Sequence, residues 1–260
     1  MTRRRRSLLP RTILLSAAAV YIVLASWGGI WERLLSPIMP DVQEYLYPRV
    51  GLWTLTWQHC VLVSVSSTLS ILVGMGTGIL ATRSFGRDFL PAVNSLVSVG
   101  QTFPPVAVLA LAVPSVGFGA EPAIIALFLY GLLPVVRNTV GGLEAVTPAV
   151  REAAMGMGMT ELQALWRVEL PLSAKVIMAG IRTSVVINIG TATIGATIGA
   201  GGLGAPIITG LASDNTAFIL QGSILAALFA IIADAALDII ENQLGPASTQ
   251  AGEKEDGQPQ

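Results

Sequence analysis

Long apolar segments, separated by short charged ones, limit this chain to very few kinds of fold. The segments cover residues 13–30, 52–82, 92–114, 122–136, 176–198 and 217–240. A helix needs roughly 20 apolar residues to cross a bilayer, and most of these segments exceed that length. Charged residues make up only 12% of the chain, whereas soluble domains carry roughly a quarter. We therefore expect an all-α polytopic membrane protein with about six transmembrane helices.

The two ends of the chain are polar. Residues 1–12 are rich in arginine, and we expect them to form a cytoplasmic N-terminus. A signal peptide would also begin basic and continue apolar, but no small-residue cleavage pattern follows the first segment, so we expect it to be retained. Residues 13–244 then form the transmembrane domain, with an exposed loop at 31–51 that could hold a short interfacial helix. Residues 245–260 are polar and predict a disordered tail.

The double proline Pro104-Pro105 interrupts the third segment. The helix must break or kink there, because proline lacks an amide hydrogen and clashes with the preceding turn. Freed carbonyls are tolerated in a membrane only where protein or water satisfies them, so the stretch is either part of a translocation path or a simple kink. Polar residues within spans are further path candidates, with helix packing as the alternative: Gln101, Asn188 and Thr191.

Glycines and isolated polar residues predict how the spans pack. Gly74 and Gly78 stand four residues apart, which permits close helix packing. The run at 199–206 holds too much glycine to continue as a helix. His59 is the only histidine, and we expect it in helix packing or at an interface. Three acids share one helical face at the end of the last segment: Asp234, Asp238 and Glu241. We expect them to mark the membrane exit rather than a proton relay.

The loop between the fourth and fifth spans, about 137–175, is both charged and strongly helical. Thr147 is a suitable N-cap with Pro148 at the first helical position, which predicts a short helix over 148–157. Gly158 suits the left-handed backbone that ends such a helix. The loop therefore begins with a capped helix and a glycine turn.

A second short helix follows that turn. Thr160 and Gln163 form a capping box at its start, and Pro171 stops or bends it. Three apolar residues share one of its faces by three- and four-residue spacing: Leu162, Leu165 and Trp166. An ordinary amphipathic loop between membrane helices would show the same pattern, and that alternative stays open.

The same loop resembles a motif of a known family, the permease subunits of ABC importers. The matching residues, with valine where isoleucine is commoner, are Glu152-Ala153-Ala154, Gly158, Val168 and Leu170-Pro171. The resemblance implies a type I ABC importer permease fold in which this loop carries the coupling helix, which docks into a cleft of a separate cytoplasmic ATPase. Glu152 would bind a basic ATPase residue, the two alanines would allow close approach, and Gly158 would permit the turn.

Residues 101–211 are similar to the osmoprotectant branch of these permeases, which imports glycine betaine, choline and carnitine. The stretches that carry the similarity are 101–104, 134–139, 152–171, 179–183 and 187–204. Ala205 stands where the family often has aspartate, and Phe103 and Pro105 also depart from its pattern. These departures bear on the cargo more than on the fold.

The resemblance also implies partners and a mechanism of alternating access. Two permease subunits, identical or paralogous, would form the pathway, and an ABC ATPase dimer would drive it. A periplasmic or lipid-anchored binding protein would deliver the solute, and an aromatic cage for the quaternary ammonium would lie largely there. An importer of an amino acid, another methylated amine or a thiolated betaine would share the motifs. A channel or sensor would not need the cytoplasmic motif.

Positive charges fall on one side of the expected spans. With the N-terminus inside, the outer loops hold only Arg33 and Arg49. The inner segments hold Arg3, Arg4, Arg5, Arg6, Arg11, Arg83, Arg87, Arg137, Arg151, Arg167, Lys175 and Lys254. The positive-inside rule then places both termini and the 137–175 loop in the cytoplasm. The resemblance implies that the membrane is the bacterial inner membrane.

Several kinds of chemistry lack the residues they need. A phosphate-binding loop has lysine after glycine, but neither Lys175 nor Lys254 follows a glycine, so this chain is not expected to be the ATPase. One histidine and one cysteine, His59 and Cys60, cannot form a usual zinc site, and no glycine-framed nucleophile accompanies His59. We expect a transporter subunit rather than an enzyme, with membrane lipid but no nucleic acid as a partner and no cofactor in this chain.

Overall fold

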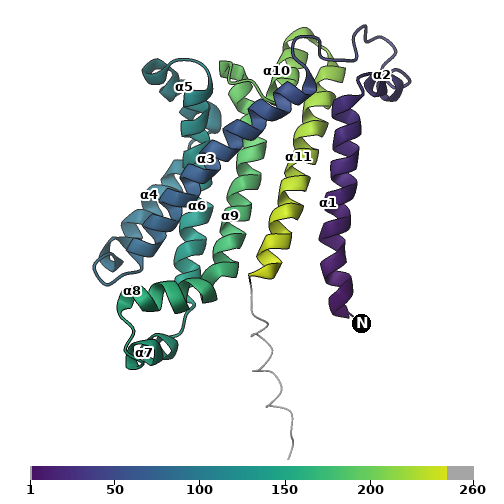
Figure 1. Ribbon diagram of the computed structural model, residues 1–260. Helices are drawn as coiled ribbons and strands as arrows, with labels where there is room; N and C mark the ends of the chain where they lie inside the picture. Colours follow the sequence, from purple (N-terminus) through teal and green to yellow (C-terminus); the bar gives the residue numbers. More distant parts are fainter. Residues whose placement is uncertain (1, 245–260) are drawn as a thin grey trace, which may run out of the picture.

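The computed structural model describes residues 2–244, which fold into helices and connecting turns without a strand (Figure 1). The elements in chain order are α1 (Thr2–Ser26), α2 (Gly29–Leu35), α3 (Leu52–Ala81), η1 (Arg87–Phe89), α4 (Leu90–Thr102), α5 (Pro105–Val116), α6 (Ala120–Glu144), α7 (Pro148–Gly156), α8 (Glu161–Ala164), η2 (Leu165–Glu169), α9 (Leu170–Ala192), η3 (Thr193–Ile198), α10 (Gly204–Ser213) and α11 (Thr216–Gln243). The tail at 245–260, which the sequence predicts to be disordered, lies outside the described residues.

Four of the described helices are long and apolar enough to cross a membrane: α3, α6, the helix running from Glu161 to Ile198, and α11. The pair α1 and α2, bent by 102°, is a fifth candidate. The segment 92–114 forms no continuous span, because Phe103 and Pro104 are extended, with ψ of 133° and 139°, as residues before a proline prefer. The expected break is confirmed. About six crossings were expected, and the described residues offer four candidate spans, or five if α1 and α2 count as one.

α1 and α2 pack against the C-terminal helix. Tyr21 and Leu24 of α1 lie in one buried cluster with Leu225 of α11, and the Tyr21 hydroxyl lies 2.6 Å from Thr56 Oγ1 of α3. Trp31 of α2 is buried, and its Nε1 donates to the Leu24 carbonyl at 2.9 Å. The short helix expected near the start of the 31–51 loop is therefore present.

α3, α6 and α9 lie together at the centre of the bundle (Figure 1). A Cβ placed on Gly78 of α3 would lie 2.7 Å from the Thr139 Cβ of α6, and one on Gly74 would lie 2.9 Å from the Val135 Cβ. A Cβ on Gly180 of α9 would also clash with α6. The close packing predicted from the Gly74 and Gly78 pair is confirmed.

The glycine-rich run after η3 leaves the helical conformation only briefly. Three of its glycines have positive φ: Gly199, Gly201 and Gly202. The chain then forms α10, a helix that was not expected from the sequence. The expected loop at Asp214 and Asn215 is present: Asp214 has φ +53°, and the Asn215 side chain caps α11 by accepting two backbone amide hydrogens.

His59 of α3 is fully buried and fixes the glycine-rich run to the bundle. Its Nδ1 accepts a hydrogen bond from the Leu203 amide at 3.3 Å. Because Nδ1 accepts, Nε2 carries the hydrogen and donates to the Ile189 carbonyl of α9 at 3.0 Å. The neighbouring Gln58 accepts from the Gly202 amide at 3.0 Å. Helix packing, one of the two roles expected for His59, is the role the structure shows.

The three acids at the end of α11 meet an arginine of α9. Arg182 donates to both carboxylate oxygens of Asp234, at 2.5 and 2.7 Å, and also pairs with Asp238 and Glu241. Bidentate arginine–carboxylate bonds fix geometry as well as adding energy. The network joins the two helices at the end of the molecule where α11 finishes (Figure 1). Helical spacing in the sequence predicts that the three acids share one face, but it does not predict Arg182 as their partner.

Gly78→Ala should weaken the packing of α3 on α6, because the new methyl group would lie 2.7 Å from the Thr139 Cβ. Overpacking of this kind costs about 1–3 kcal/mol, so the detergent-solubilised variant should unfold at a lower temperature than the parent protein. Gly76→Ala is the matched control on the same helix, since a Cβ there meets nothing within 4 Å. Equal melting temperatures for the two variants would contradict this account of the interface.

Candidate functional site

α7 begins and ends much as the sequence predicts. Thr147 occupies the N-cap with an extended backbone, although its side chain makes no capping bond, and Pro148 is the first helical residue. The helix ends at Gly156, one residue earlier than expected. Gly158 has φ +81°, and its amide donates to the Met155 carbonyl at 2.9 Å. The left-handed glycine turn is therefore confirmed.

The capping box of α8 is also confirmed. The Thr160 amide donates to the Gln163 side-chain oxygen at 2.9 Å, and the Gln163 amide donates to Thr160 Oγ1 at 3.3 Å. These reciprocal bonds satisfy two amides that would otherwise lack partners at the start of the helix. They fix the point at which the chain leaves the turn after α7.

Pro171 was expected to stop or to bend the second helix, and the stop is wrong, because the chain stays helical through this residue and on to Ala192. Pro171 is the second residue of α9, and η2 before it is a π-helical turn. Proline offers no amide hydrogen to the carbonyl one turn earlier, and a π turn shifts hydrogen-bond partners by one residue. α8, η2 and α9 therefore form one continuous helix, which is itself the candidate span Glu161–Ile198 together with η3.

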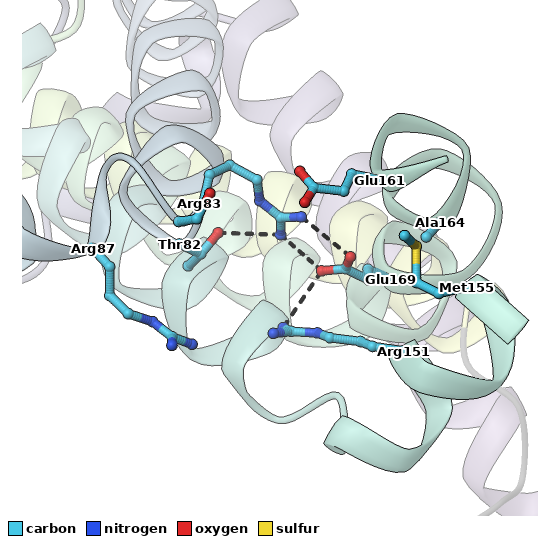
Figure 2. Close-up of a pocket in the computed structure, with 9 residues that line it drawn as sticks. Thr82, Arg83, Arg87, Arg151, Met155, Glu161, Ala164 and Glu169 are labelled. Atoms are coloured by element: carbon cyan, nitrogen blue, oxygen red, sulfur yellow. Dashed lines mark hydrogen bonds and ion pairs between the residues drawn. The ribbon is translucent and has the colours of Figure 1, made fainter. Parts of the chain in front are cut away.

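Glu169, at the end of η2, is a buried carboxylate held by arginine. Its side chain is only 4% exposed. Arg83, just after α3, donates to both carboxylate oxygens, at 3.2 Å to Oε1 and 2.7 Å to Oε2 (Figure 2). This bidentate geometry is the strong form of a carboxylate–arginine pair. It joins the end of α3 to the start of α9.

Arg151 of α7 adds a second cation to the same carboxylate. Its Nη2 lies 3.4 Å from Glu169 Oε2 (Figure 2) and donates to the Leu143 carbonyl at 2.5 Å. That carbonyl belongs to the last turn of α6, where a cation is favoured by the helix dipole. Parts of α3, α6, α7 and η2 therefore meet at one group of charges, which we call the Glu169 cluster: Arg83, Arg151 and Glu169.

A cavity of about 260 Å³ opens beside the Glu169 cluster (Figure 2). Its walls come from the end of α3, the following turn, α7, α8 and η2: Thr82, Arg83, Ser84, Arg87, Arg151, Met155, Glu161, Ala164 and Glu169. Glu161 lies on this wall without an ion pair to the arginines shown. Among the described residues, no group of acids, histidines or cysteines could hold a metal ion.

The motif residues of the loop divide between solvent and core. Glu152, Ala153 and Gly158 are exposed, whereas Ala154 is 1% exposed and is the one buried residue of α7. Farther along, Leu170 is half-buried and Pro171 is exposed. α7 therefore turns the Glu152 carboxylate outward and touches the rest of the chain through a narrow inner face.

The apolar face expected on the second helix is only partly exposed. Leu165 is buried, but Leu162 and Trp166 are 65% and 63% exposed. Met155 and Met157 add exposed apolar surface at the end of α7. We call these four residues the apolar loop surface: Met155, Met157, Leu162 and Trp166. Large exposed apolar side chains gathered on one segment often mark an interaction site.

Asn188 and Thr191, the two polar path candidates whose side chains the structure describes, lie in different surroundings. Asn188 is fully buried, and its side-chain amide donates to Ser67 Oγ of α3 at 3.0 Å, which favours the packing alternative. Thr191 is half-buried and lies beside Pro105 at the start of α5. Gln101 lies in α4, and its side chain is outside the described set.

Sequence reasoning missed the Glu169 cluster, although one signal was available. Glu169 stands four residues before Ser173 and eight before Ile177, both of which are buried. Residues at this spacing share a helical face, and a carboxylate on such a face needs a cation or several donors. The identity of the cations follows only from the fold, because Arg83 is far away in the sequence.

Comparison with known proteins gives a consistent result. Residues 74–248 match the family described as binding-protein-dependent transport system inner membrane component. The chain is 42% identical to the osmoprotectant import permease protein OsmY of Salmonella typhimurium, over 76% of this chain and 84% of the relative. It is 39% identical to the choline transport system permease protein OpuBB of Bacillus subtilis, over 82% and 97%. It is 45% identical to the carnitine transport permease protein OpuCB of Listeria monocytogenes, over 74% and 87%.

Solved structures share the fold at lower identity. An inward-facing structure of the MetNI methionine ABC transporter has a TM-score of 0.66 at 21% identity, covering 75% of this chain and 96% of that one. An amino acid ABC transporter has a TM-score of 0.61 at 20% identity, covering 74% and 93%. These likenesses show the fold, that of a type I ABC importer permease.

Thr160→Ala should loosen α8, because it removes half of the capping box. Loss of an N-cap bond costs about 1 kcal/mol, so hydrogen exchange at the amides of 161–164 should accelerate. Thr147→Ala is the matched control, since Thr147 occupies an N-cap without making a side-chain bond. Equal acceleration in the two helices would show that the capping box does not order α8.

Proposed function

The chain belongs to the family of binding-protein-dependent transport system inner membrane components, and on that premise we propose that it is the permease subunit of an ATP-driven importer of osmoprotectants. The cargo class is quaternary amines such as glycine betaine, choline and carnitine. The single observation that carries this choice is the similarity, at 39–45% identity over most of the chain, to permeases named for osmoprotectants, choline and carnitine.

The subunit works with three kinds of partner. A second permease, identical or paralogous, completes the pathway, and a separate ABC ATPase dimer hydrolyses ATP. A periplasmic or lipid-anchored binding protein delivers the solute, in keeping with the description of the family. Recognition of the quaternary ammonium by aromatic rings takes place largely on that binding protein, so this chain supplies a pathway rather than the main selectivity.

The membrane is the bacterial inner membrane, and both termini lie in the cytoplasm. The start of α1, the end of α11 and the α7–α8 segment lie at the same end of the molecule (Figure 1). Arg83, Arg87 and Arg151 gather at that end, as the positive-inside rule requires of a cytoplasmic face. This orientation presents α7 to a cytoplasmic ATPase.

α7 is the coupling helix. Its exposed Glu152 binds a basic residue of the ATPase by a charge-assisted hydrogen bond. Ala153 lets the ATPase surface approach closely, and Gly158 makes the turn that follows. The apolar loop surface adds the buried area that a specific interface needs. Movement of the ATPase on ATP binding displaces α7 and, through Leu170 and Pro171 at the start of α9, rocks the spans between outward-open and inward-open states.

The pathway itself lies where two permease subunits meet. Thr191 and Gln101 are its candidate polar residues in this chain, because both lie near the break between α4 and α5. Asn188 contributes as a packing residue between α3 and α9, given its complete burial. Pro104 and Pro105 offer no amide hydrogen to the carbonyl groups one turn earlier in α4, and a water-filled path can satisfy those groups.

Uptake of labelled glycine betaine into proteoliposomes tests the proposal. The vesicles hold this chain with the ATPase, permease and binding protein encoded beside it. We expect uptake that requires both the binding protein and ATP on the ATPase side. ATP-dependent uptake of another solute but not of betaine, choline or carnitine would overturn the cargo, and failure of the chain to assemble with any ATPase would favour a channel or sensor.

Gly158→Leu should uncouple the transporter without removing it from the membrane. Only glycine adopts φ +81° without strain, so leucine should displace α7 and lower uptake strongly while the amount of inserted protein stays constant. Gly156→Ala is the matched control, because that exposed position meets nothing within 4 Å and has no positive φ. Normal transport by a well-inserted Gly158→Leu protein would contradict the role of this turn.

Glu152→Gln should weaken binding of the ATPase, because it removes the charge that a basic partner residue would bind. Binding measured between purified permease and ATPase in detergent should fall and should lose part of its salt dependence. Glu144→Gln, at an exposed position at the end of α6, serves as the control. Unchanged affinity and unchanged salt dependence for Glu152→Gln would remove this residue from the interface.

A further inference from the structure

Glu169 is the one carboxylate among the described side chains that the fold buries almost completely. We propose that Glu169 is a positioning residue that makes the coupling helix α7, the end of α3 and the start of α9 move as one body. The inference rests on the coupling role proposed for α7. It assigns a mechanical function to three residues that are not among the specified positions of the motif: Arg83, Arg151 and Glu169.

Few contacts attach α7 to the transmembrane helices. Ala154 is its one buried residue, and a methyl group gives a small contact without directional preference. Arg151, by contrast, reaches from α7 to Glu169 at 3.4 Å and to the Leu143 carbonyl at 2.5 Å. The side chain of one arginine therefore forms most of the specific connection between α7 and the transmembrane helices.

Burying these charges is not, by itself, an effective way to stabilise the folded protein. Removing charges from water is costly, and a buried ion pair often contributes no more than apolar side chains of similar size. What such a pair does supply is geometry, because the planar guanidinium of Arg83 binds both Glu169 oxygens at once. A displacement of η2 relative to α3 would break both bonds and leave the buried carboxylate with Arg151 alone, at 3.4 Å.

The helical turn that holds Glu169 is continuous with α9. Glu169 ends η2, which passes without interruption into α9. A force applied to α7 reaches Glu169 through Arg151 and then divides, passing into α9 along the helix and into α3 through Arg83. The Glu169 cluster thus lies where one input from the ATPase becomes the movement of two central helices.

Glu169→Gln keeps the size of the side chain and removes its charge. We expect solute imported per ATP hydrolysed in proteoliposomes to fall by at least about fivefold, the lower end of typical coupling between sites. Glu161→Gln is the matched control, because Glu161 lines the same cavity without an ion pair in the cluster. A coupling ratio for Glu169→Gln equal to that of the control would overturn the proposal.

A paired variant separates linkage from stability. In Arg83→Met with Glu169→Met, both charges of the bidentate pair are removed, and Arg151, whose side chain is 29% exposed, keeps its bond to the Leu143 carbonyl, so the melting temperature should recover relative to Glu169→Gln. The directional bonds are still missing, so the coupling ratio should stay low. Recovery of the coupling ratio together with the melting temperature would show that the cluster acts only through stability, and would overturn the proposal.

Hydrogen exchange tests the tether without any cargo. In purified permease without ATPase, Glu169→Gln should accelerate exchange in α7 at 148–156, whereas exchange in α11 should match the parent protein. Unchanged exchange in α7 would overturn the tether even if transport were normal. Absence of uptake by the parent complex, with accelerated α7 exchange in the variant, would instead contradict the proposed cargo and leave the tether supported.

Discussion

The charge of Glu169 constrains the whole end of the molecule that holds α7 and α8. A carboxylate removed from water must have cations or several donors around it, and the two arginines that meet this need come from separate parts of the chain. Arg83 follows α3 and Arg151 lies on α7. Because both must reach one carboxylate, the end of α3, α7 and the start of α9 can adopt only a narrow range of relative positions.

A related constraint acts within the bilayer, where backbone groups must be satisfied by the protein itself. Near the glycine-rich run, Gln58 and His59 supply side-chain acceptors for the amides of Gly202 and Leu203. At Phe103 and Pro104 the helix opens instead. Side chains of α3 therefore close the first break, whereas the second remains a candidate for the proposed pathway.

Much of this structure follows from local sequence. The turn at Gly158, the capping box of Thr160 and the break before Pro105 depend on residues within a few positions, whose stereochemistry allows few alternatives. Contacts between residues far apart in the sequence were harder to predict. The residues near Glu169 in the sequence do not identify Arg83 as its partner, and those near Asp234 do not identify Arg182. The continuation through Pro171 depends on a π turn, which a rule based on proline alone does not include.

If α7 and α9 move together when the ATPase closes, as proposed above, a pair of spin labels measures this directly. Labels at Met157→Cys on the exposed loop and at Thr183→Cys on α9, with Cys60→Ser to remove the native cysteine, report the separation of the two elements. A third label at Leu211→Cys, on α10 at the opposite end (Figure 1), reports the rocking of the bundle. We expect the 157–183 distance to stay constant on ATP trapping while the 157–211 distance changes. A shift in the 157–183 distance would contradict the account.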